Sequence, residues 1–172
     1  MASTNIIARL WAFSGVVAIE LRLEIEDLYT AYAAALDDDN LDAWPEFFTE
    51  DCLYQVIPRD NFDRDLPLAL IRCESRAMLC DRVTAVRKTT MFEPRYIRHL
   101  ISNVQVAPEV DGIIETQANY AVFETMTDAY TRVFNVGRYL DRLVREDGML
   151  LFCEKRCVYD SVLVPNSIIY PI

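Results

Sequence analysis

The sequence predicts an α+β fold, with helices in the first half of the chain and a mainly antiparallel sheet in the second. Apolar residues recur at helical spacing in the first half, whereas residues 95–161 consist of long β-rich runs. Two Asp-Gly pairs, at 111–112 and 147–148, separate these runs and are typical of tight hairpins. Segregated helices and strands indicate an α+β plan rather than alternating α/β. The 172 residues contain no internal repeat and fit one domain.

The first helix is expected from about Glu20 to Leu36. Its apolar residues recur at i, i+3, i+4, i+7 and i+11, so they share one face, and the acidic residues fall outside it. That face consists of Ile25, Leu28, Tyr29, Tyr32 and Leu36. The helix is expected to end at the polar run Asp37–Asn40. A second short helix should span Leu41–Phe48, because Asn40 is a good cap and an acid in the first turn suits the helix dipole.

The middle of the chain predicts two strands and one more helix. Residues 51–58, "DCLYQVIP", indicate a strand that a proline ends, and the polar residues 59–67 indicate a loop. Residues 68–74 fit a brief strand. A third helix is expected over residues 75–89, with Ser75 as its cap and apolar residues at helical spacing.

Four β-rich runs predict the sheet; they span residues 95–110, 112–127, 129–147 and 148–161. In the last two runs charged and apolar residues share a face. The expected faces are Val136, Arg138, Leu140, Arg142 and Val144 in one run, and Phe152, Glu154, Arg156, Val158 and Asp160 in the other. Opposite charges on neighbouring strands can pair across the sheet. Such a face could line a polar cavity, form a subunit interface or be an exposed sheet surface, and the sequence leaves all three open.

The chain is acidic, with a formal net charge of −10. A surface of that sign repels phosphate backbones and anionic lipids, so we expect neither nucleic acid nor a membrane among the partners.

Five cysteines stand at positions 52, 73, 80, 153 and 157. An odd number without paired short spacings argues against a disulfide framework. On a strand the last two thiols would share one face about 13 Å apart, which is too far to share a metal ion. We therefore interpret all five as buried, apolar thiols.

His99 is the only histidine, and histidine is the side chain that most often acts as a general base. It shares a predicted strand face with Ile97 and Ile101, a pattern typical of a core or interface histidine. A catalytic dyad would need an orienting carboxylate, which the sequence does not identify.

Asp81, Arg82 and Arg87 on the third predicted helix are a second candidate group. The arginines could anchor a ligand carboxylate, whereas ion pairs on the helix surface are the commoner arrangement. The sequence has no glycine-rich phosphate loop, no Gly-x-Ser-x-Gly elbow and no dinucleotide fingerprint. Positive signs of catalysis within this chain are therefore few.

Four stretches in this order resemble the small (β) subunit of Rieske-type aromatic-ring-hydroxylating oxygenases. They are "LYTAYAAALDDDNLDAWPEFFTEDCLYQVIPRDN", "AMLCDRVTAVRKT", "YIRHLISNVQV" and the apolar tail "NSIIYPI". The resemblance covers about Glu20 to Ile172, and the combination is more specific than any single stretch. Within the family the chain looks most similar to small subunits of enzymes that act on aromatic acids, such as salicylate 5-hydroxylase, with the terephthalate and anthranilate enzymes more distant.

The resemblance implies a cone-shaped fold like those of nuclear transport factor and ketosteroid isomerase. In such a fold about three N-terminal helices pack on a strongly curved, mixed, mainly antiparallel sheet. It also implies a non-catalytic structural subunit of a cytoplasmic oxidoreductase that hydroxylates an aromatic acid, such as salicylate, in aromatic-compound catabolism. The implied partner is a catalytic α subunit, in a hexamer of three α and three β chains on a base of three β chains.

In that family the α subunit carries a Rieske 2Fe-2S cluster and a mononuclear Fe(II), and NADH supplies electrons through a separate reductase. Such iron sites need Cys-x-His motifs and a set of two histidines and one carboxylate. A chain with one histidine can supply neither set. We therefore expect no catalytic, cofactor-binding or metal-binding residue in this chain.

The acidic run Asp37–Asp39, followed by Trp44, Phe47 and Phe48, could be the rim of an active-site pocket or a solvated turn beside an apolar helix. With the resemblance, we interpret the three aspartates as a solvated turn between the first two helices. The aromatic rings are expected to pack the short helix over the mouth of the cone.

Residues 1–18 are expected to be an N-terminal extension, and residues 19–172 a single cone-fold domain of the small-subunit type. The uncharged run "LWAFSGVVAI" at 10–19 is far shorter than a membrane span. A signal peptide with a cleavage pattern at Val16 and Ala18 is the alternative for this segment.

Two other functions stay open. A stand-alone isomerase or dehydratase of the same fold would place His99, or an acid such as Asp51, in an apolar pocket. A ligand-binding or protein-interaction module of this fold is the third possibility.

Overall fold

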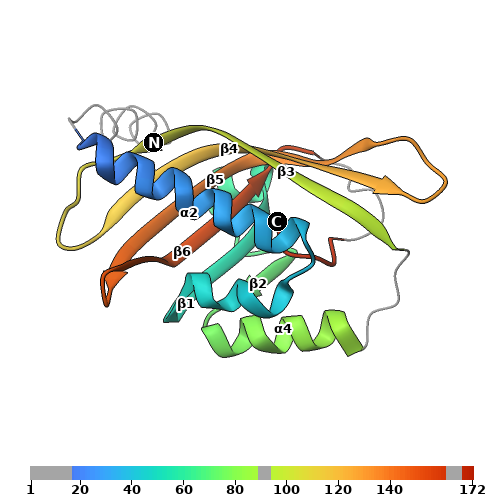
Figure 1. Cartoon of the computed structure of the whole chain (residues 1–172), viewed down its shortest axis with the longest axis horizontal. Helices are drawn as coiled ribbons and strands as arrows, with labels where there is room; N and C mark the ends of the chain where they lie inside the picture. The colour runs from blue at the N-terminus through green and yellow to red at the C-terminus, as the bar shows by residue number, and fades with distance from the viewer. Residues whose placement is uncertain (1–16, 89–93, 162–167) are drawn as a thin grey trace.

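A six-stranded sheet forms the frame of the molecule, and one long helix lies across one of its faces (Figure 1). The computed structural model describes residues 17–88, 94–161 and 168–172. The strands follow the order β2-β1-β6-β5-β4-β3 and are antiparallel to their neighbours, except that β1 and β6 run parallel. They are β1 (Phe48–Pro58), β2 (Ile71–Cys73), β3 (Arg95–Val106), β4 (Ile114–Met126), β5 (Arg132–Glu146) and β6 (Met149–Tyr159).

The helices of the described residues all precede the long strands β3 to β6 in the chain. Those in the described residues are α2 (Ile19–Asp37), the 3-10 helix η1 (Leu41–Phe47), α3 (Arg59–Asp63) and α4 (Arg76–Lys88). In Figure 1, α2 crosses the long strands, while η1 and α4 lie beside β1 and β2. This segregation confirms the predicted α+β class. No helix in the described part of the chain is both long and apolar enough to cross a membrane. The expected extension falls almost wholly outside the described residues.

The predicted apolar face of α2 is buried against the sheet. Tyr29 and Tyr32 place their ring centroids 5.9 and 5.7 Å from that of Phe152 on β6. Ile25 and Leu36 are buried on the same face. Burying an aromatic side chain of this kind contributes about 2 kcal/mol, so the packing of α2 accounts for a large share of the core.

Both predicted Asp-Gly turns are confirmed. The φ angles are 52° and 78° at Asp111 and Gly112, and 48° and 85° at Asp147 and Gly148. A two-residue type I′ hairpin turn requires left-handed backbone at both central positions, which aspartate tolerates and glycine adopts freely.

Two helical predictions differ from the structure. Residues 41–47 form a 3-10 helix rather than an α-helix, with Pro45 inside it, and Phe48 already begins β1. Proline lacks the N–H that a continuing α-helix needs, which favours a short, tight helix here. The predicted loop at 59–67 contains the one-turn helix α3. The predicted cap of α4 is confirmed, because Ser75 Oγ accepts a hydrogen bond from the N–H of Met78 at 3.3 Å.

A β-bulge at Cys153 changes the predicted face of β6. Leu143 of β5 pairs with Phe152, whereas Arg142 pairs with Glu154, so Cys153 is one extra residue on β6. The prediction that Phe152 shares the outer face with Glu154 is therefore wrong, and Phe152 lies fully buried in the core.

Gly137 stands where β5 passes very close to its neighbour β6. A Cβ atom at this position would lie 2.2 Å from the main-chain oxygen of Val158, far inside contact distance. Only glycine fits here without moving one of the two strands.

We expect Gly137→Ala to lower the free energy of unfolding by about 3 kcal/mol, because the two strands must separate to admit the methyl group. Gly148→Ala is the matched control, since its Cβ would meet nothing within 4 Å and only the left-handed backbone penalty, about 1 kcal/mol, applies. Urea unfolding measures both variants. Equal losses in the two variants would contradict the close approach of the strands.

Candidate functional site

The interior, meaning the space that α2, η1 and the inner face of the sheet enclose, is centred on a buried ion pair. Lys155 Nζ lies 2.8 Å from Asp141 Oδ2, and neither side chain is exposed. The two residues face each other on β6 and β5. Sequence reasoning missed this pair. The one sequence feature that points to the pair is that Asp141 alternates with Tyr139 and Leu143 on the same strand face, and both of these residues are buried.

Aromatic rings surround the Lys155 ammonium. Its Nζ lies 3.5 Å from the ring centroid of Tyr139, and within 5.0 Å of the centroids of Tyr32, Tyr29 and Phe152. The electron-rich faces of these rings stabilise a cation where water cannot reach it. The predicted core aromatics of α2 therefore also solvate a charge.

Asp141 completes the neutralisation of the interior. Tyr29 Oη donates a hydrogen bond to Asp141 Oδ2 at 2.8 Å and lies 2.9 Å from Thr116 Oγ1. Burial raises the pKa of the Asp141 carboxyl above its ordinary value, and the Lys155 ammonium counteracts part of that rise. The pair is sealed from solvent and presents no exposed atom to a substrate.

Residues 168–172 extend into the same interior. The main-chain oxygen of Ile172 accepts hydrogen bonds from Tyr32 Oη at 2.8 Å, and from Tyr54 Oη and Cys157 Sγ at 3.3 Å each. Burial raises the pKa of both tyrosines well above the ordinary value and that of the Cys157 thiol to about 12. All three groups therefore keep their protons at neutral pH and act as donors.

The candidate arginines of α4 hold parts of this chain rather than a ligand. Arg82 Nη2 donates to the main-chain oxygens of Ile168 and Ile169 at 3.2 and 2.7 Å. Arg87 Nη1 lies 2.7 Å from Asp39 Oδ2, in the turn after α2. The expected surface ion pair is thus present for Arg87, whereas Arg82 binds main-chain oxygens, and the third candidate, Asp81, is exposed.

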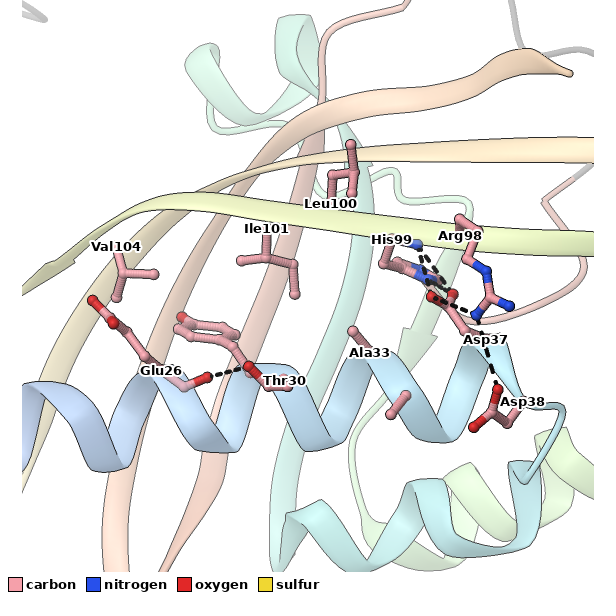
Figure 2. Close-up of a pocket in the computed structure, with 12 residues that line it drawn as sticks. Glu26, Thr30, Ala33, Asp37, Asp38, Arg98, His99, Leu100, Ile101 and Val104 are labelled. Carbon is pink, nitrogen blue, oxygen red and sulfur yellow. Dashed lines mark hydrogen bonds and ion pairs between the residues drawn. The ribbon is translucent and has the colours of Figure 1, made fainter.

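His99 has the carboxylate partner that the sequence could not identify, and it is Asp37 at the end of α2 (Figure 2). His99 Nδ1 of the imidazole ring lies 2.6 Å from Asp37 Oδ1. The main-chain N–H of His99 donates to both carboxylate oxygens at 3.1 Å. The imidazole is 0% exposed and the carboxyl 9%. The prediction of a wholly solvated turn is therefore wrong for Asp37, whereas Asp38 and Asp39 are exposed as expected.

The dyad borders a groove of about 400 Å³ between α2 and β3. Ile101 and Val104 line one end of the groove, and Arg98, Asp37 and His99 line the other (Figure 2). His99 Nε2 is buried and has no hydrogen-bond partner among the described residues. Because this nitrogen is shielded, a molecule in the groove cannot reach it without a rearrangement. We interpret the dyad as a clasp that joins the end of α2 to the edge strand.

The three predicted lid aromatics lie deeper than expected. Trp44 and Phe48 are fully buried and Phe47 is partly buried, so they belong to the core rather than to a cover over its mouth. Trp44 packs edge-on against Tyr54 with ring centroids 5.0 Å apart.

Asp51 and the cysteines give two further outcomes. Asp51 is exposed on β1, so it is not an acid in an apolar pocket. Cys80 is exposed and Cys153 half-buried, so the prediction that all five thiols are buried is wrong. No three histidine, cysteine, aspartate or glutamate side chains within the described ranges lie close enough together to hold a metal ion.

The outer sheet face, the side of β3–β6 turned away from α2, exposes apolar side chains. Tyr96 is 77%, Leu100 60% and Val133 52% exposed. Leu100 pairs through Ala121 with Val136, so apolar residues of three strands form one row. In Figure 2, Leu100 points away from α2.

Charged groups border this row on β5 and β6. Arg142 Nη1 lies 3.7 Å from Glu154 Oε2, which confirms the predicted pairing of opposite charges across the sheet. The Nε atoms of Arg138 and Arg142 are buried and have no hydrogen-bond partner in the described part of the chain. Exposed apolar side chains bordered by arginines are typical of a protein–protein interface.

A curved sheet around a helix, with an interior that its own residues fill and an outer face rich in apolar side chains, defines a cone-fold protein suited to association. The comparisons agree with this class. Residues 31–166 match the model of the ring hydroxylating beta subunit family, and the chain belongs to that family.

The similar proteins carry the same description. The anthranilate 1,2-dioxygenase small subunit of Burkholderia cepacia is 37% identical over 87% of this chain and 92% of its own length. A terephthalate 1,2-dioxygenase β subunit of a Comamonas species is 32% identical over 87% of this chain and 97% of its own. A β-subunit crystal structure from Novosphingobium aromaticivorans, assigned to an aromatic-ring-hydroxylating dioxygenase, is 38% identical with a TM-score of 0.82, over 91% and 100% of the two chains. The predicted family and fold are confirmed; a nearer relation to salicylate 5-hydroxylase stays a prediction.

Replacing Lys155 with methionine should lower the free energy of unfolding by about 4 kcal/mol, because the Asp141 carboxylate is then buried without a cation. The double variant Lys155→Met, Asp141→Leu is the control and should recover most of the loss, since both charges are gone. Urea unfolding near neutral pH measures both. A single variant as stable as the unmodified chain would contradict the buried pair.

The same variant should show a distinct pH dependence. Without the ammonium, the folded-state pKa of Asp141 rises further above its unfolded value. An acid with a raised folded-state pKa binds more protons when folded, so its unfavourable contribution shrinks as pH falls through that pKa. The stability difference between the unmodified chain and Lys155→Met should therefore be smaller at about pH 5 than at about pH 7. A constant difference would speak against Asp141 as the cause.

Proposed function

We propose that this chain is the structural β subunit of a multicomponent aromatic-ring hydroxylase, and that its outer sheet face binds the neighbouring subunits. One observation carries the proposal: the interior is filled by Lys155 and residues 168–172, while apolar side chains lie exposed on the outside. In a protein with this distribution, most of the apolar surface that association can still remove from water lies on the outer sheet face. Exposed apolar patches of this kind mark association sites.

The iron centres of such an enzyme belong, in this proposal, to a catalytic α subunit that carries a Rieske 2Fe-2S cluster and a mononuclear Fe(II). NADH would supply electrons through a separate reductase. The donors of this chain do not fit either centre, because its single imidazole already uses Nδ1 on Asp37 and its thiols are scattered. No step of the hydroxylation is therefore assigned to residues of this chain.

The residues of this chain would act by holding a rigid shape. The His99–Asp37 clasp fixes α2 to β3, and the Lys155–Asp141 pair fixes β6 to β5. A rigid sheet can hold neighbouring α subunits in the ring that brings the cluster of one close to the iron of the next. We place the assembly in the cytoplasm, as three α and three β chains on a base of three β chains. An obligate interface of this kind buries more than about 2,000 Å².

The proposed substrate is an aromatic acid. The names of the two curated relatives, an anthranilate and a terephthalate dioxygenase, support this class. Salicylate is the particular acid that the sequence resemblance favours. The influence of this chain on substrate choice would be indirect, because it would act through the position of the α subunits.

Placing a charge on the outer sheet face should prevent assembly. In co-expression with a catalytic α subunit of this class of enzyme, we expect the unmodified chain to co-purify in fixed stoichiometry and Leu100→Asp to lose at least about nine-tenths of the bound α subunit. Leu68→Asp is the matched control, because Leu68 is 72% exposed in the segment before β2, and β2 is at the opposite edge of the sheet from β3. Circular dichroism should show that both variants fold. Normal assembly of Leu100→Asp would remove the outer sheet face from the interface.

A stand-alone isomerase or dehydratase is the second candidate, and the Asp37–His99 dyad is the observation that favours it. His99→Ala separates the two readings, because it removes the only imidazole. The structural reading predicts a loss of stability of about 2 kcal/mol, because the buried carboxyl of Asp37 loses the imidazole and keeps only the main-chain N–H of residue 99, and no turnover by the isolated chain before or after the change. Turnover of a small substrate by the isolated chain, abolished in a folded His99→Ala variant, would support the enzyme instead.

A further inference from the structure

Three hydrogen-bond donors from three different elements converge on one oxygen atom in the interior. They are Tyr32 Oη of α2, Tyr54 Oη of β1 and Cys157 Sγ of β6, and the oxygen is the main-chain oxygen of Ile172. We propose that this interior is a binding site for a small carboxylate with an aromatic or branched apolar body, which residues 168–172 of the same chain occupy.

The donors are positioned by elements that do not depend on the occupying segment. Tyr32 lies on the buried face of α2, and Tyr54 and Cys157 lie on the paired strands β1 and β6. Site groups on helices and strands are held more rigidly than groups on loops. Without residues 168–172, the same three donors would still point at the place that the Ile172 oxygen fills.

The chemistry of the lining selects the class of ligand. The hydroxyls and the thiol keep their protons at neutral pH, so all three can donate to a ligand oxygen; Tyr54 Oη also accepts a hydrogen bond from the Ile172 N–H at 2.8 Å. The Lys155 ammonium lies in the same interior, 4.7 Å from the Tyr32 ring centroid, so an anionic ligand would have a cation near it as well as Asp141. The rings of Trp44 and Tyr54 pack edge-on at 5.0 Å and give an apolar wall. A carboxylate on a flat or branched apolar body meets all three conditions.

The segment is held in place from outside the interior. Arg82 binds the main-chain oxygens of Ile168 and Ile169, and Tyr170 Oη donates to Asp39 Oδ1 at 3.0 Å. Ile172 itself is buried, with 1% of its surface exposed. A tethered segment competes at an effective concentration on the order of millimolar, so a weakly binding free carboxylate cannot displace it. The site is therefore closed in the intact chain, which agrees with a non-catalytic subunit but does not rest on that role.

The test compares the full chain with a variant that lacks residues 168–172, with sodium benzoate as the probe. We expect the shortened variant to bind benzoate at least about tenfold more tightly than the full chain, measured by saturation-transfer NMR and by the rise in melting temperature. Benzyl alcohol, which keeps the ring and lacks the carboxylate, should bind at least about tenfold more weakly than benzoate. Tyr54→Phe in the shortened variant should weaken benzoate binding severalfold, and the peptide Ile-Ile-Tyr-Pro-Ile should displace benzoate.

A second variant covers the case in which the shortened chain does not fold by circular dichroism. The double variant Arg82→Ala, Tyr170→Phe keeps residues 168–172 in the chain but removes the hydrogen bonds that hold them from outside the interior. Benzoate should therefore bind to this variant and raise its melting temperature more than that of the unmodified chain. The benzoate concentration is set about tenfold above the effective concentration of the tethered segment. If either variant folds and does not bind benzoate at that concentration, the proposal is overturned. Benzoate binding that Tyr54→Phe and Tyr32→Phe both leave unchanged would overturn it as well. Assembly with an α subunit is read separately, by co-purification of the full chain.

Discussion

The buried Lys155 ammonium is the constraint on which the arrangement of the interior depends. A lone cation in an apolar core is prohibitively costly, so Asp141 must face it and aromatic rings must surround it. Such a pair adds little net stability compared with apolar residues, and its value lies in specificity. If β6 slipped by one residue against β5, Lys155 would move to the sheet face opposite Asp141, so the pair fixes the register of the two strands.

Because the interior is filled by residues of the chain itself, the protein can bind other molecules mainly through its outer surface. The aromatic residues of α2, β1 and β5 that could surround a small molecule instead surround Lys155 and contact Ile172. The outer sheet face carries the opposite pattern, with exposed Leu100 and Val133 beside the paired charges of Arg142 and Glu154. Membership of the ring hydroxylating beta subunit family fits this division, because an accessory subunit needs a stable shape and a surface rather than an open pocket.

The fold could be predicted from the sequence further than the site could. The helical spacing of Ile25, Tyr29 and Tyr32 and the two Asp-Gly turns depend on local periodicity, and both were confirmed. The Lys155–Asp141 pair could not be predicted, because it depends on strand register and on the extra residue at Cys153. The partner of His99 lies 62 positions away, so no local pattern could identify Asp37. Pro45 favours a tighter helix over residues 41–47, but the Asn40 cap and the acid in the first turn do not distinguish a 3-10 helix from an α-helix.

The claim that this chain works through its outer surface can be tested most directly by electron cryomicroscopy of the complex with its catalytic subunit. The account predicts that Tyr96, Leu100 and Val133 become buried against neighbouring subunits, while Lys155 and Asp141 keep their contact and the iron lies wholly within the other chain. A complex in which these three side chains stay exposed to solvent, or in which substrate or metal occupies the interior of this chain, would contradict it.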